Sequence, residues 1–131
     1  MFYVFTCTPL QHTTENTPTE EPLRLTPGII HQVDVLFQDG CDHAQHVQIW
    51  DRNFLLWPSN RGESLRGNAT VISFREFYEI MPAYTVLTAK TWTAEDTADI
   101  VEVIIQIGLL PKRIIQPMAF EELLSAAAGI A

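Results

Sequence analysis

The chain has 131 residues, 47% of them hydrophobic, which suits one ordinary domain with a substantial core. Its formal net charge is −8, so electrostatic repulsion disfavours nucleic acid and anionic membrane surfaces as partners. Its apolar stretches fall far short of the ~20 residues that span a bilayer as a helix. Two cysteines, Cys7 and Cys41, allow one disulfide but no disulfide framework, and the sequence leaves open whether they are bonded.

The first hydrophobic segment, Phe2–Thr8, is aromatic and β-branched and predicts a β-strand. A polar stretch with Thr, Glu and Pro follows it and shows no core-forming periodicity. A strand alone cannot satisfy its backbone groups in water, so it must join its own sheet or a neighbour's, and cis or trans pairing stays open. We interpret residues 1–22 as an N-terminal arm, a strand plus a linker. Its candidate interface residues are Phe2, Tyr3, Val4 and Phe5.

Residues 23–111 show short alternating segments between turn signals, and we interpret them as the body of the protein. Strands are expected at Ile29–Phe37, Val47–Trp50, Phe54–Trp57, Ala69–Phe74, Tyr84–Trp92 and Ile100–Ile107. Residues 75–80 fit either one turn of helix or a continuing strand. Strands spaced by about 8–12 residues are typical of an all-β sandwich or barrel. We therefore predict an antiparallel, jelly-roll-like β-sandwich.

Residues 112–131 are interpreted as a tail that ends in a short helix. Pro117 suits a first helical turn, and apolar residues follow it on one helical face. A helix of this length is marginal alone, so its apolar face must dock on the body or on a neighbour. The candidate interface residues of the tail are Phe120, Leu123 and Leu124.

Candidate chemistry is concentrated in residues 39–46, which contain metal-ligand residue types, among them His43 and His46. A transition-metal site needs three or four converging ligands, and the sequence has no CxxC and no second ligand pair at standard spacing. The acidic residues 95–99 lack the regular spacing of a calcium loop, and no serine lies in a GxSxG setting. We predict no metal, no cofactor and no enzymatic activity, and the role of the two histidines stays open.

The three tryptophans, Trp50, Trp57 and Trp92, are expected mainly in the core or at an interface, as is usual in a sandwich of this size. Aromatic rings can also stack on sugars. The alternative function is therefore a carbohydrate-binding β-sandwich module that uses Trp57 and Trp50 beside a loop at residues 60–68.

Three segments carry a resemblance: residues 28–41 (GIIHQVDVLFQDGC), Val47–Ile49 and Leu56–Asn60. Over residues 25–111 the chain resembles small β-sandwich proteins of tailed-phage virions and related particles. The resemblance implies a structural part, such as a capsid decoration, adaptor or tail component, and it carries over no active site. The histidine loop and the C-terminal helix depart from this pattern.

The sequence thus predicts a structural subunit of a larger assembly that interlocks with its neighbours through the N-terminal strand and the C-terminal tail. Its expected partners are copies of itself or other structural proteins, with no nucleic acid and no membrane. Its expected location is a virion or extracellular particle, after a cytoplasmic stage. Deleting residues 1–22 is expected to abolish assembly and to leave a folded body.

Overall fold

A computed structural model describes residues 1–10, 13–40, 42–93 and 102–111. Within these ranges the chain forms eight β-strands and no helix, which confirms the predicted all-β class. The strands are β1 (Phe2–Cys7), β2 (Thr19–Arg24), β3 (Gly28–Phe37), β4 (Gln45–Asp51), β5 (Phe54–Trp57), β6 (Thr70–Ile80), β7 (Val86–Thr93) and β8 (Val103–Leu110). The predicted tail helix, with Phe120, Leu123 and Leu124, lies outside the described residues.

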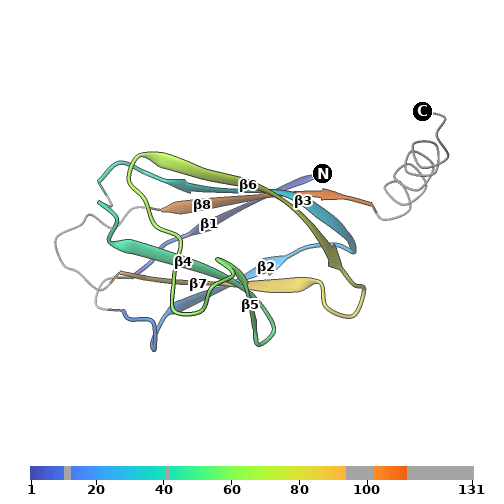
Figure 1. The fold of residues 1–131 in the computed structure, drawn as a ribbon, viewed down its shortest axis with the longest axis horizontal. Coiled ribbons are helices and arrows are strands. Elements are labelled where there is room, and N and C mark those ends of the chain that lie inside the picture. The colour runs from blue at the N-terminus through green and yellow to red at the C-terminus, as the bar shows by residue number, and fades with distance from the viewer. Residues whose placement is uncertain (11–12, 41, 94–101, 112–131) are drawn as a thin grey trace.

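The strands form two four-stranded sheets that face one another as two layers (Figure 1). The first sheet has the order β1-β8-β3-β6 and the second the order β2-β7-β4-β5. Every pairing is antiparallel. The chain changes sheet at each connection except the one between β4 and β5, so consecutive strands lie mostly in opposite layers. The predicted β-sandwich is confirmed.

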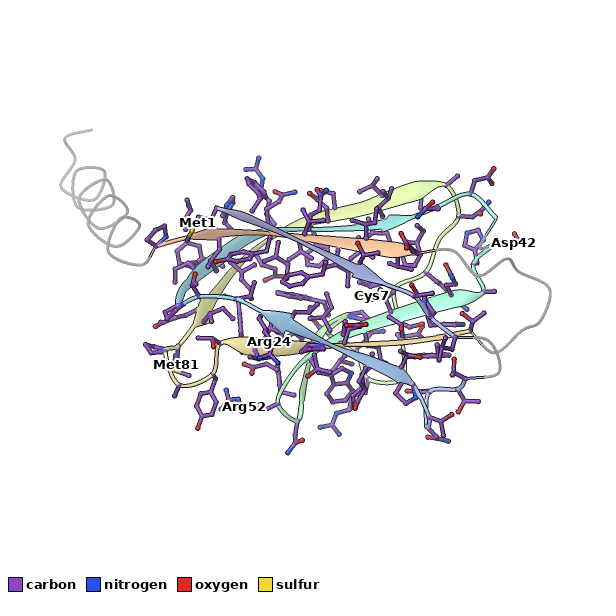
Figure 2. All side chains as sticks on the ribbon, turned by 180° about the vertical axis from the view of Figure 1, so that it is seen from behind. Met1, Cys7, Arg24, Asp42, Arg52 and Met81 are labelled. Atoms are coloured by element: carbon purple, nitrogen blue, oxygen red, sulfur yellow. The ribbon has the colours of Figure 1, made fainter. Side chains whose placement is uncertain are left out.

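The core fills the space between the layers (Figure 2). The alternation expected from the sequence is confirmed over Val33–Phe37 and Val103–Ile107 on the central strands, where every second side chain is buried and its neighbours are half-buried or exposed. The central strands contribute Val33, Val35 and Phe37 from β3 and Val103, Ile105 and Ile107 from β8. Facing them, the second sheet contributes Val47, Ile49, Leu87 and Ala89.

Residues 75–80, left open between helix and strand, continue β6 as a strand. The pairing of β3 shifts register at His31 on both sides. In the β3–β6 pairing the additional residue is on β6, and in the β3–β8 pairing it is on β3. On β6 this shift falls between Arg75 and Tyr78. Such a bulge bends the strand and re-aims side chains. As a result Tyr78 packs against the core while Phe77 is exposed.

Residues 1–22, interpreted as an arm, supply an edge strand to each sheet within the chain. β1 pairs with β8 from Phe2 opposite Gly108 to Cys7 opposite Val103, and β2 pairs with β7. Tyr3 and Phe5 pack against the core and Cys7 is fully buried. Removal of residues 1–22 would therefore expose part of the core, and whether a folded body remains without them stays a prediction. Whether β1 also exchanges between copies stays a prediction.

Burial of Cys7 and Tyr78 predicts a loss of stability at alkaline pH. Burial, with a smaller contribution from Glu21, raises the pKa of the Cys7 thiol from 9.0 to about 12. Burial and the hydrogen bond to Asp51 raise the pKa of Tyr78 from 10.0 to about 12. Both groups hold their protons more tightly when folded, so their contribution is complete below pH 9 and is lost as pH rises toward 12.

We therefore expect the unfolding free energy, measured by urea denaturation, to begin to decline just above pH 9. In Cys7→Ala the decline should begin nearer pH 10, where only Tyr78 contributes. An identical pH profile in both proteins would contradict the burial of the thiol.

Candidate functional site

Trp57, a predicted ligand-binding residue of the alternative function, lies in the core. Its side chain is 5% exposed, and its ring meets the rings of Phe74 and Tyr78 edge-on, with centroid distances of 5.6 and 6.2 Å. A sugar cannot stack on a ring that is covered on this scale. Trp57 is therefore a core residue, in agreement with the general expectation for tryptophans in a sandwich of this size.

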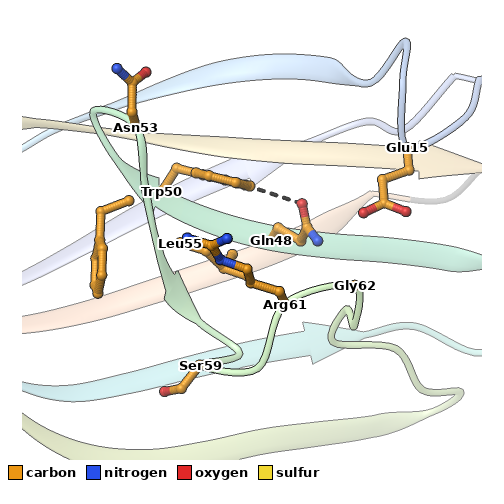
Figure 3. A pocket seen from close by; sticks show the side chains of 9 residues that line it. Glu15, Gln48, Trp50, Asn53, Leu55, Ser59, Arg61 and Gly62 are labelled. Atoms are coloured by element: carbon orange, nitrogen blue, oxygen red, sulfur yellow. Dashed lines mark hydrogen bonds between the residues drawn. The ribbon is translucent and has the colours of Figure 1, made fainter.

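Trp50, the second predicted ligand-binding residue, lines a hollow of about 350 Å³ beside the second sheet (Figure 3). Strands β4 and β5, the turn between them, the loop after β5 and the segment before β2 all contribute side chains. The lining residues are Glu15, Gln48, Trp50, Asn53, Phe54, Leu55, Ser59, Arg61 and Gly62. The volume lies within the ~300–1,000 Å³ typical of small-ligand sites.

The orientation of the Trp50 ring is set by its neighbours. Its Nε1 donates a hydrogen bond to Gln48 Oε1 at 3.1 Å, and the Lys90 ammonium lies 4.5 Å from the ring centroid. Gln48 is only 2% exposed, and its Nε2 donates to the Glu63 carbonyl oxygen at 2.8 Å. The floor of the hollow is thus fixed before any ligand arrives.

The outer face of the first sheet carries large apolar side chains on both edge strands. Phe2 and Val4 on β1 are 64% and 61% exposed, and Val71 and Phe77 on β6 are 52% and 70% exposed. A shallow groove around the bulge joins the two edges, with Phe2 and Phe77 among its lining residues. Phe2 and Phe77 thus belong to one surface groove, while Val4 and Val71 add exposed apolar side chains outside its lining.

Polar side chains occupy the middle of the same face. Gln32 donates from Nε2 to Asp34 Oδ1 at 3.0 Å and to Ser73 Oγ at 2.8 Å, and the Ser73 hydroxyl donates to Asp34. Arg75 and Glu76 line the groove beside this network. Among the described residues, neither of these two charges makes a hydrogen bond or ion pair.

The third feature of this face is the contact of Phe2 and His31 across Gly108. The two rings meet edge-on with centroids 5.8 Å apart. A Cβ on Gly108 would lie 2.8 Å from both Phe2 Cε1 and His31 Nε2, so a larger residue there would push the rings apart. Because Gly108 has no side chain, the Phe2 ring from β1 and the His31 ring from β3 can contact one another over β8.

The histidine loop holds no metal centre among the residues that the structure describes, where no three His, Cys, Asp or Glu side chains converge. His46 Nδ1 lies 2.7 Å from Ser64 Oγ, and its ring stacks on Trp92 at 5.1 Å. His43 is exposed, with Nδ1 4.0 Å from Asp42 Oδ1. Cys41 and the acidic residues 95–99 lie outside the described ranges.

A buried carboxylate, Asp51, links the β4–β5 turn to β6. The Tyr78 hydroxyl donates to it, and Arg52 Nε donates to it at 3.2 Å while the guanidinium lies 3.8 Å from the Tyr84 ring centroid. Every member has a partner inside the chain. The arrangement therefore fixes the hairpin that borders the Trp50 hollow.

Comparison of the chain with protein-family models, curated proteins and solved structures finds no match. Within the described ranges, no helix has the length and apolar character needed to cross a membrane. Sequence reasoning singled out Phe2, Val4 and Trp50 but missed Phe77, Arg75 and Gln48. The bulge that exposes Phe77 left a helix-like spacing in the sequence, and nothing local indicated that Gln48 would be buried.

Proposed function

We propose that this chain is a structural subunit of a larger assembly and packs against copies of itself through the outer face of the first sheet. The observation that carries the proposal is the set of apolar side chains there, each more than half exposed: Phe2, Val4, Val71 and Phe77. Burying such side chains stabilises a contact by roughly 1.5–3 kcal/mol each when burial is complete. In a monomer these side chains stay exposed to water, and the chain does not gain this stabilisation.

The charges on this face fit a second copy of the chain. With a net charge of −8, two copies repel one another at long range, so a contact needs a local attraction. Arg75 and Glu76 are adjacent, of opposite sign and without partners among the described residues. In a two-fold contact the same patch meets itself, so each arginine can face the other copy's glutamate and fix the register.

The strand orders support a particle subunit at the level of architecture. The orders β1-β8-β3-β6 and β2-β7-β4-β5 are those of a jelly roll, which is found in viral capsid and lectin domains. Together with the resemblance to tailed-phage β-sandwich proteins, this favours a virion component or a related extracellular particle. A fold hosts many functions, so the proposal depends on the exposed face.

Interlocking through the N-terminal strand remains part of the proposal in a specific form. Copies would exchange β1, so that Phe2–Cys7 of one chain occupies the same register on β8 of its neighbour. Exchange of an identical element reuses contacts that already exist within one chain and adds few new ones. The tail residues proposed as a second interface lie outside the described ranges.

Phe77→Asp tests the proposed face. We expect light scattering to give a discrete oligomer for the native chain and a monomer for the variant, because an unpaired carboxylate would be buried in the contact. Phe54→Asp is the matched control, since Phe54 is 67% exposed but belongs to the second sheet. If the native chain is an oligomer and Phe77→Asp leaves its mass unchanged, another surface makes the contact.

A further inference from the structure

The Trp50 hollow lies on the second sheet, away from the proposed assembly face, and belongs to a single chain. The two charged residues of its lining come from different segments: Glu15 precedes β2, and Arg61 lies in the loop after β5 (Figure 3). Both side chains are exposed. Because the hollow and the proposed assembly face lie on opposite sheets, ligand binding and assembly can be tested separately.

The hollow combines an apolar surface with scattered polar groups. Trp50, Phe54 and Leu55 supply the apolar part, and Phe54 is exposed at the rim. The polar part contains one acid, one base, amides and a hydroxyl. A purely apolar ligand would leave the polar groups unpaired, which opposes binding.

The charges argue against an ionic ligand. A cation would meet Arg61 in the lining, and an anion would meet Glu15 in a chain of net charge −8. A ligand without net charge avoids both conflicts, and one with apolar faces and many hydroxyls around its edge suits the aromatic, amide and hydroxyl groups of the lining. Sugar rings have this character, since their C–H faces stack on aromatic rings while their hydroxyls both donate and accept hydrogen bonds.

The geometry points to a binding site for a neutral oligosaccharide, and we infer that Trp50 is its stacking platform and that Arg61 is a hydrogen-bond donor at its edge. The Gln48 bonds and the Lys90 contact hold the platform in place, so binding does not have to order it. Such preorganisation lowers the entropic cost of association. This site keeps Trp50 and, through Arg61, the loop that the sequence predicted, but it does not include Trp57, which is buried.

The test is isothermal titration calorimetry of the full chain with cellohexaose, maltohexaose and mannohexaose, and with hexagalacturonate as an acidic probe. We expect at least one neutral hexasaccharide to bind with a dissociation constant below about 1 mM. Trp50→Ala and Arg61→Ala should each weaken that binding by about tenfold or more. Arg66→Ala, which removes an exposed arginine outside the lining, should leave it unchanged.

Arg61→Ala keeps the test decisive if Trp50→Ala fails to fold, because Arg61 is exposed. The inference is overturned if no neutral probe binds at about 5 mM, if hexagalacturonate binds more tightly than every neutral probe, or if Arg61→Ala binds as the native chain does. None of these outcomes bears on the assembly face, which light scattering tests separately.

Discussion

Trp57→Ala is expected to lower the unfolding free energy by about 3–5 kcal/mol, the usual cost of truncating a large core aromatic. The ring is 5% exposed and contacts Phe74 and Tyr78, so its removal leaves a cavity between the sheets. Since a domain of this kind is stable by about 5–15 kcal/mol, the loss is a large share of the total. Urea denaturation followed by far-UV circular dichroism measures it.

Trp50→Ala is the matched control for this experiment. Trp50 is half-buried and lies on the outer side of β4, so we expect a clearly smaller loss. Equal losses in the two variants, or a loss below about 1 kcal/mol for Trp57→Ala, would contradict the placement of Trp57 in the core.

Deletion of residues 2–8 is expected to destabilise the chain by at least about 3 kcal/mol, because two or more core side chains contribute about 1.5–3 kcal/mol each. Tyr3, Phe5 and Cys7 pack against the core, and β1 satisfies the ladder groups of β8 along six registered pairs. The truncated chain should therefore unfold at lower urea concentration or fail to unfold cooperatively.

Adding a synthetic peptide of residues 1–8 in trans should restore part of the lost stability. Val4→Thr is a control inside the deleted segment, because Val4 points outward and is exposed, and it should leave stability nearly unchanged. A truncated chain as stable as the native one would show that this strand is an independent arm, as the sequence alone suggested.

Seven of the eight strands in the described part of the chain were predictable, most of them from local alternation and the others from short runs of aromatic or apolar residues. Val103, Ile105 and Ile107 alternate with polar or less buried neighbours, and the structure buries all three. The strand Thr19–Arg24 was missed because it contains Pro22 and few apolar residues. Proline is tolerated on an edge strand, and β2 is at the edge of its sheet.

The sites were less predictable than the strands, because they depend on pairing between distant segments. Trp50 follows the regular alternation of β4 and points away from the core, next to the buried Ile49. Trp57 pairs with Ile49 and faces the core, and β5 has one additional residue between its pairings with Ile49 and Trp50. Phe77 is exposed because of the irregular pairing near His31. Local periodicity carries no information about such shifts, so the apolar face and the Trp50 hollow emerged only from the fold.

The mass of the native chain in solution tests the central claim most directly. Light scattering over a range of protein concentrations should give a discrete multiple of the 14.8 kDa chain mass that persists on dilution toward the micromolar range. A mass of one chain at every concentration would contradict the proposal that this protein is a self-assembling structural subunit.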